Sequence, residues 1–278
     1  MLWPRRACGR AGGARGGFAL RPRFAAGRRG RRAARAGRRW QPLLLRPLKA
    51  MGCILKGGGG LYSRLRVGAV LLAAGQGSRL GGRPKCLLEL GGVPLLRRQL
   101  IALSGGGVDE LVVVLGHHAA RIEPVVSEFP VSVVRNPEPD QGQASSTRVG
   151  LQALPEVDCV LVALADQPLL HAQDVSELIK AYKQRGEGIE LVQPLVYGQP
   201  GNPLVFSAAV REQILAGPGD AACRRWQERH ASQVLRWPTS NRRYAVDIDT
   251  EQDIEALAQR TGHQLRWPPD LARPAMRP

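Results

Sequence analysis

Short apolar runs alternate with segments of helical character from residue 67 onward. Their Val, Leu, Ile and Ala content predicts buried strands over residues 69–73, 110–115, 131–134 and 159–164. Helical segments are predicted to begin near Pro94, Ala119 and Ala144. This alternation is typical of a mostly parallel sheet with helices on both faces, and the length suits one core domain. Ligands of such sheets bind beyond the carboxyl ends of the strands.

The positive charge of the chain lies almost wholly in its first 66 residues. The 278 residues carry a formal net charge of +17, but residues 1–66 hold 18 of the 40 Lys and Arg and no Asp or Glu. The remainder therefore has 22 basic and 23 acidic residues. The leader is rich in Arg, Gly, Ala and Pro and is expected to be disordered. We predict a leader over 1–66, a core domain over 67–262 and a Pro-rich tail over 263–278 that adds nothing to a functional site.

The leader has three open interpretations: an arm for RNA or a membrane surface, an organelle transit peptide, or upstream sequence translated from a start codon placed too early. Transit peptides are rich in Ser, whereas no Ser precedes Ser63. Met51 lies shortly before the core, so the early start codon is preferred. A non-enzymatic nucleic-acid-binding protein acting through the leader is the alternative of another class. The near-neutral core has few aromatic residues for stacking bases, which argues against a nucleic-acid partner.

Cysteine content and hydropathy favour a reduced, cytoplasmic protein. The five cysteines are odd in number, scattered and without a C-x-x-C pair, so neither a disulfide framework nor a zinc site is expected. No apolar run approaches the ~20 residues that span a bilayer, and no membrane partner is expected.

A cationic, glycine-rich loop follows the first predicted strand. It contains Gly75, Gly77, Gly81 and Gly82 together with Arg79 and Lys85. Glycine lets backbone N–H groups approach phosphate oxygens, and the cations neutralise the phosphate charge. The loop lacks the third glycine of a dinucleotide fingerprint, and no Gly-Lys-Ser/Thr follows as in a Walker loop. It is therefore predicted to bind phosphate in another way.

A second turn-rich segment, residues 136–150, leads into a predicted helix. Gly142, Ser145 and Ser146 would place small polar groups and free amides at the N-terminus of that helix. Such a terminus favours an anion or the polar edge of a base. The ordinary alternative is an N-cap by Ser or Thr.

Two acidic segments complete the candidate chemistry. Asp166 follows the fourth apolar run, where a carboxylate is poorly solvated unless it meets a cation. Mg²⁺ suits this position because it combines a few carboxylates with water and substrate phosphates. Residues 244–249 are predicted as a short strand ending in Asp247 and Asp249, and a capped helix follows from Thr250. Asp247 is the preferred second metal ligand and Asp249 the alternative.

Five separated blocks together resemble the molybdenum cofactor nucleotidyltransferases, and most closely their cytidylyltransferase branch. The blocks are the glycine loop with Lys85, residues 136–150, Asp166-Gln167-Pro168, residues 197–206 and residues 247–250. The likeness covers roughly Val67 to Gln259. It implies a Rossmann-like, nucleotide-diphospho-sugar transferase-like fold.

The resemblance also implies roles for individual residues. The nucleotide would be bound by Ala73, Ala74, Gly75, Gly77, Ser78, Arg79, Lys85, Gly142 and Ser146, and the acceptor by Gly201, Asn202 and Pro203. Asp166 and Asp247 would bind Mg²⁺, and Lys85, Arg79 and Asp166 would be catalytic. One departure concerns the acceptor, because Asn202 stands where the cytidylyl branch usually has His.

The implied reaction moves CMP from CTP to the terminal phosphate of molybdopterin or the molybdenum cofactor and releases pyrophosphate. The opening Leu-Ala-Ala-Gly favours CTP over the GTP of the guanylyl branch. A molybdoenzyme or its chaperone would be a further partner. A sugar- or alcohol-phosphate nucleotidyltransferase is the closest alternative, and the absence of long sugar-binding insertions in this core argues against it.

Overall fold

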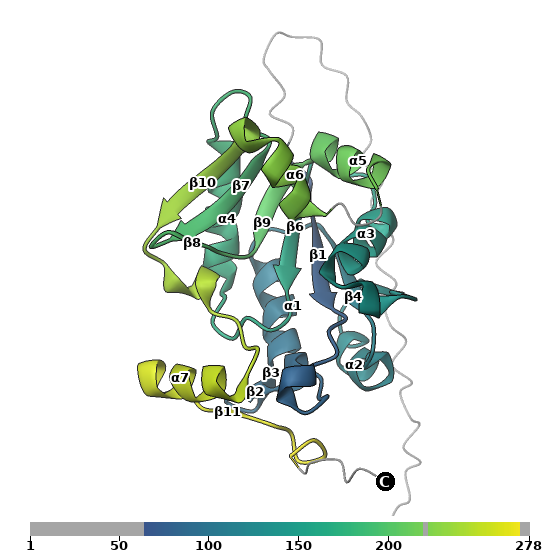
Figure 1. Ribbon diagram of the computed structural model, residues 1–278, viewed down its shortest axis with the longest axis vertical. Helices are drawn as coiled ribbons and strands as arrows, with labels where there is room; N and C mark the ends of the chain where they lie inside the picture. The colour runs from purple at the N-terminus through teal and green to yellow at the C-terminus, as the bar shows by residue number, and fades with distance from the viewer. Residues whose placement is uncertain (1–63, 219–221, 273–278) are drawn as a thin grey trace, which may run out of the picture. The chain divides into compact units, whose positions relative to one another are not determined.

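The residues described by this computed structural model, 64–218 and 222–272, form a main sheet of eight strands with helices on both faces (Figure 1). The order is β10-β7-β9-β6-β1-β4-β5, and β8 pairs with β7. The strands are β1 (Val67–Ala73), β4 (Glu110–Leu115), β5 (Ser132–Arg135), β6 (Cys159–Leu164), β7 (Leu191–Val196), β8 (Gln199–Pro200), β9 (Leu204–Ser207) and β10 (Val234–Thr239). β9 is antiparallel to β6 and β7, and β8 is antiparallel to β7, whereas the other pairings are parallel. The predicted fold class is confirmed.

The central strand β1 shows why the sheet needs cover on both faces. All seven of its residues are buried. Ala69 and Leu71 join the core on one face, while Val70 and Leu72 join the core on the other. Alternate side chains of a strand point to opposite faces, so a continuous apolar run is stable only between two layers of helices.

Six helices supply that cover. On one face lie α1 (Leu95–Gly105), α2 (Ala119–Val126) and α4 (Ala172–Lys183), and on the other lie α3 (Gln143–Ala153), α5 (Ala208–Ala216) and α6 (Cys223–Arg229). The predicted strands and helix starts in residues 69–164 are confirmed within one or two residues. Among the described residues, no helix is both long and apolar enough to cross a bilayer.

A smaller unit packs beside the main sheet. It contains α7 (Glu251–Thr261) and a three-stranded sheet of β2 (Glu89–Leu90), β3 (Val93–Pro94) and β11 (Leu265–Arg266), in the order β11-β2-β3. Its apolar centre includes Leu80, Leu88, Ile248 and Leu257. The loop after β1 is thereby anchored to the same core as the acidic segment before α7.

At the domain ends, the predicted start of the tail needs correction. The predicted tail begins at residue 263, yet β11 pairs with β2 and Leu271 is buried in the main core, so the fold continues past residue 262. Of the leader, residues 1–63 lie outside the described residues, whereas Arg64 and Arg66 form ion pairs with Asp109 and Glu110.

The short strand predicted over residues 244–249 is wrong. Residues 242–245 form a 3₁₀ turn, and Asn241 caps it by accepting a hydrogen bond from Arg243 N. Tyr244 is fully buried, and its hydroxyl donates to Asp174 O at 2.6 Å. Side-chain anchoring therefore holds this segment where strand pairing was expected. The predicted helix cap at Thr250 is confirmed, with a capping box completed by Asp253.

Candidate active site

The loop after β1 is a tight turn that glycine makes possible. Gly77 has φ of 70°, and a Cβ atom there would lie 1.9 Å from Arg83 O. The N–H groups of Leu80 and Gly82 both donate to Gly77 O, at 2.9 and 3.0 Å. Leu80 is buried, whereas Arg79 is exposed. The buried side chain of Leu80 therefore anchors the loop, and Arg79 lies on its solvent-exposed side.

Lys85 is the electrostatic centre of the site. Its ammonium forms a short ion pair with Asp166 and a second one with Asp249 at 2.8 Å. Arg79 binds the other oxygen of Asp249, also at 2.8 Å. Three segments far apart in sequence thus meet: the loop after β1, the end of β6 and the chain before α7. Since β1 and β6 are parallel neighbours, their carboxyl ends reach this point together.

The pKa values of the three charged groups reflect a balance between burial and charged partners. Desolvation raises the pKa of Asp166, which is 7% exposed, despite the opposing charge of Lys85. Burial alone would lower the pKa of Lys85, but Asp166 and Asp249 together hold it above its usual value. Burial acts against ionisation of Asp249 as well, but Lys85 and Arg79 outweigh it and lower the pKa of that carboxyl. A positive charge on Lys85 is therefore strongly favoured at neutral pH.

The neighbouring Cys86 does not share this chemistry. Its thiol is buried, and burial raises its pKa to about 12. A thiol in this state is protonated at neutral pH and is a weak nucleophile. Cys86 packs beneath the loop, as its place in the apolar core indicates.

A divalent cation fits the space beside Asp166. Oδ1 of Asp166 is buried and has no hydrogen-bond partner. A hollow of about 30 Å³ between Gly75, Lys85 and Asp166 adjoins it, enough for a water-sized group. Burial raises the pKa of Asp247, and the negative charges of Asp166 and Asp249 raise it further. In residues 64–218 and 222–272 no set of three or more His, Cys, Asp or Glu is arranged around a metal position, so an ion here would depend on phosphate and water ligands.

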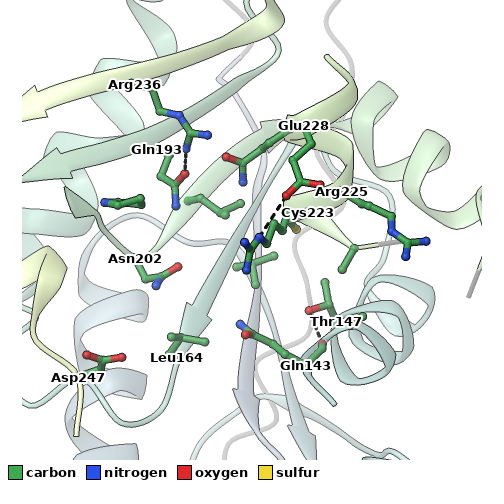
Figure 2. Close-up of a pocket in the computed structure, with 17 residues that line it drawn as sticks. Gln143, Thr147, Leu164, Gln193, Asn202, Cys223, Arg225, Glu228, Arg236 and Asp247 are labelled. Carbon is green, nitrogen blue, oxygen red and sulfur yellow. Dashed lines mark hydrogen bonds and ion pairs between the residues drawn. The ribbon is translucent and has the colours of Figure 1, made fainter. Parts of the chain in front are cut away.

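A cavity of about 880 Å³ opens beside this cluster (Figure 2). Asp247 and Asn202 line one end, and Arg236 with Gln193 lines the other. The remaining walls come from α3, α6 and the strands β6 and β9. The cavity is therefore acidic near Asp247 and cationic at its far end.

The predicted acceptor segment forms part of the cavity wall. Asn202 lines it, and the Asn202-Pro203 peptide bond is cis. Gly201 lies against Tyr244, where an added Cβ atom would be 2.9 Å from Tyr244 O. A side chain at residue 201 would push Tyr244 away, so the glycine keeps the two segments in contact.

The predicted nucleotide residues are only partly brought together. Ala73 and Ala74 are buried at the end of β1, and Gly142 is the N-cap of α3. Ser146 is buried and accepts a hydrogen bond from Asn136 at 3.0 Å, so it braces the turn instead of lining the cavity. The α3 side chains that do line the cavity are Gln143, Ala144 and Thr147.

Sequence reasoning missed the residues that join these parts. The amide of Gln167 is 1% exposed and donates to Asn202 O and Tyr244 O, at 3.1 and 3.2 Å. Asp174 is fully buried and binds Arg243 and Asn241. The sequence offered one signal for Gln167, which is its position directly after Asp166. No local pattern identifies Asp174 as a partner of residues 241–243, because nearly 70 residues separate them.

Comparison with known proteins places the chain among proteins of one fold. A sequence profile of the family described as "MobA-like NTP transferase domain" matches residues 69–234. Nicotine blue oxidoreductase from Paenarthrobacter nicotinovorans is 31% identical over 196 residues, which cover 69% of this chain and 96% of that protein. A nucleotidyl transferase from Methanothermobacter thermautotrophicus, Mth528, is 27% identical with a TM-score of 0.59 and covers 70% of this chain and 97% of its own. Rv0371c from Mycobacterium tuberculosis, solved in complex with manganese, is 22% identical with a TM-score of 0.53, over 70% and 98% of the two chains.

Proposed function

The chain belongs to the MobA-like NTP transferase family and is a nucleotidyltransferase, and from this premise we propose that it transfers CMP from CTP to the terminal phosphate of molybdopterin or the molybdenum cofactor. The observation that carries the proposal is the position of Lys85 between Asp166 and Asp249, next to Asp247, which lines a cavity large enough for a heterocyclic acceptor. The five sequence blocks shared with cytidylyltransferases of the molybdenum cofactor support the choice of acceptor and nucleotide.

In the proposed reaction, an oxygen of the acceptor's phosphate attacks the α-phosphorus of CTP. A new phosphorus–oxygen bond forms, the bond to the bridging oxygen of the β-phosphate breaks, and pyrophosphate leaves. The phosphate nucleophile is already anionic, so no general base is required. Lys85 and Arg79 would bind the triphosphate and stabilise charge that grows on the α-phosphate and the leaving group. Each must first exchange Asp249 for phosphate, because Asp249 binds both cations in the free protein.

Asp166 and Asp247 would hold Mg²⁺, with the unpaired Oδ1 of Asp166 as the first ligand. The bound ion would neutralise phosphate charge as a Lewis acid. Manganese in the Rv0371c structure supports the use of a divalent cation, without selecting Mg²⁺. The position of Asp247 on the acceptor cavity supports it over Asp249, whose oxygens are both occupied by cations.

Two other acceptors remain candidates for the same chemistry: a sugar phosphate and an alcohol phosphate. GTP in place of CTP is the corresponding alternative for the donor. The non-enzymatic alternative depends on the leader, whose residues 1–63 lie outside the described part of the chain.

The test is pyrophosphate release by the purified full chain with Mg²⁺, each of the four ribonucleoside triphosphates, and molybdopterin or glucose 1-phosphate. We expect turnover with CTP and molybdopterin, and a loss of at least ~100-fold in Asp166→Asn. Glu156→Gln, at an exposed position, is the matched control and should keep full turnover. Because one relative is named an oxidoreductase, oxidation of NADH and NADPH is followed in parallel. Turnover with glucose 1-phosphate but not with molybdopterin would contradict the proposal. Oxidation of NADH or NADPH without pyrophosphate release would contradict it as well.

A further inference from the structure

The backbone around Asn202 is held in place at every polar group. Four hydrogen bonds account for it: Gly201 N to Pro194 O at 2.8 Å, Gln193 Nε2 to Gly201 O at 3.1 Å, Asn202 N to Tyr244 O at 2.8 Å, and Gln167 Nε2 to Asn202 O at 3.1 Å. The two amide donors come from buried side chains. A loop whose donors and acceptors are all satisfied by buried partners is rigid and presents its side chains in a fixed direction.

In contrast to this fixed backbone, the side-chain amide of Asn202 is unpaired among the described residues. It lies in the cavity wall between Gln193 and Asp247 (Figure 2) and makes no hydrogen bond to any other residue within 64–218 or 222–272. A carboxamide offers two donors and one acceptor side by side. The amide is therefore oriented by its backbone while its hydrogen-bonding atoms stay available to a ligand.

Arg236 provides a second oriented donor group in the same cavity. Its guanidinium donates to Oε1 of Gln193, and Gln193 is 7% exposed. Because this partner is neutral, the positive charge of Arg236 is not cancelled by a carboxylate in the described part of the chain. Gln193 thus orients both Arg236, through its oxygen, and Gly201, through its nitrogen.

We propose that Asn202 is the residue that determines acceptor specificity, by pairing with an amide-type edge of a flat heterocycle. The matching ligand group is a ring N–H next to a carbonyl or ring nitrogen, since this edge accepts from the amide N–H and donates to the amide oxygen. Arg236 supplies further donors to acceptor atoms of the same ring system. The inference rests on the proposed function, in which this cavity holds the acceptor. It favours acceptors that carry such a heterocycle as well as a phosphate.

Three variants of the full chain test this role. Asn202→Asp keeps the shape but replaces donors by acceptors, Asn202→Leu removes both, and Gln199→Leu alters an exposed residue outside the cavity as the control. The free side chain of Asn202 makes no internal hydrogen bond, so all three should unfold at the wild-type temperature. The acceptor KM, kcat and the Kd of CTP are measured for each. Binding of 6-hydroxymethylpterin, which has no phosphate, is measured separately by its fluorescence.

We expect Asn202→Asp and Asn202→Leu to raise the molybdopterin KM and the pterin Kd by ~10-fold or more, with the Kd of CTP unchanged. Gln199→Leu should change none of these values. A wild-type chain that does not bind the pterin, or an unchanged pterin Kd in Asn202→Asp, would overturn the inference. If the wild type turns over no acceptor but binds the pterin, and Asn202→Asp raises the pterin Kd, the proposed transfer reaction fails while the role of Asn202 is upheld.

Discussion

Removing the ammonium of Lys85 tests the electrostatics of the site directly. In Lys85→Met, Asp249 keeps Arg79 as a partner, whereas Asp166 loses its cation while remaining 7% exposed. In Asp166→Asn, by contrast, Lys85 keeps Asp249 at 2.8 Å. Both single variants remove the same ion pair, but they should lower the free energy of unfolding by different amounts. The difference measures the cost of a buried carboxylate that has lost its cation.

The expected magnitudes follow from burial. Lys85→Met should lower the free energy of unfolding by about 3–5 kcal/mol at neutral pH, the usual cost of leaving one partner of a buried pair. Asp166→Asn should cost about 1–2 kcal/mol, because one charge-assisted hydrogen bond is lost and Lys85 stays paired. The double variant should lie close to Asp166→Asn alone, so the coupling energy should equal the cost of Lys85→Met, about 3–5 kcal/mol.

The cost of Lys85→Met should also depend on pH. Burial already raises the pKa of Asp166 above its unfolded value, and loss of Lys85 raises it further. The folded state then binds the proton more tightly than the unfolded state. The cost relative to the wild type is therefore small below the folded pKa of Asp166 in the wild type, and it grows by up to about 1.4 kcal/mol per pH unit until the higher folded pKa in Lys85→Met is reached.

Urea unfolding of the wild type, both single variants and the double variant at pH 5 and pH 8 measures these quantities. The deficit of Lys85→Met should be larger at pH 8 than at pH 5, and the deficit of the double variant should be nearly the same at both. Equal deficits for the two single variants, or a Lys85→Met deficit that does not change with pH, would refute the view that a buried, ionised Asp166 depends on Lys85.

Three further variants test the supports of the site. Asp174→Asn should cost about 2 kcal/mol in urea unfolding at pH 7, a figure discounted because the side chain of Arg243 is 41% exposed. Burial opposes ionisation of Asp174, but Arg243, the His171 N–H and Asn241 lower its pKa, so the cost should hold down to about pH 4 and shrink only below it; a cost that stays constant below about pH 4 would contradict this account. Gln167→Met should raise the acceptor KM by ~10-fold and speed hydrogen exchange in residues 200–206, with the Kd of CTP unchanged; slow exchange there would show that the amide is dispensable. Gly77→Ala should weaken CTP binding by at least ~10-fold in calorimetry, because its Cβ atom would clash with a carbonyl 1.9 Å away; Gly82→Ala, whose Cβ atom meets nothing within 4 Å, is the control for positive φ alone.

The parts of the fold that sequence predicts well are those fixed by local pattern. The runs 110–115 and 159–164 match β4 and β6 at both ends, because a buried parallel strand is a continuous apolar run bounded by turn residues. The cap at Thr250 matches as well, since a capping box involves residues only three apart.

The parts that sequence misses are fixed by long-range contacts. Tyr244 and its neighbours have strand-like composition, but the buried hydroxyl contact with Asp174 holds them in a 3₁₀ turn. The ion pair between Asp249 and Lys85 could not be predicted either, because it joins residues 164 positions apart. The three residues Lys85, Asp166 and Asp247 could be nominated from sequence, but the way Asp249 occupies both loop cations could not.

The pairing of β11 with β2 has a consequence for synthesis of the chain on the ribosome. Every strand of the main sheet lies before residue 240, whereas β11 begins at residue 265 and the guanidinium of Arg83 lies 4.1 Å from the ring centre of Trp267. Domains fold as their residues emerge, so the main sheet can form while the far side of the glycine loop still lacks its support. A chain terminated after residue 262 would keep the eight-stranded sheet but lose the strand and the indole that brace this loop. The glycine loop, which we propose binds the nucleotide, is therefore braced only after the main sheet has been synthesised.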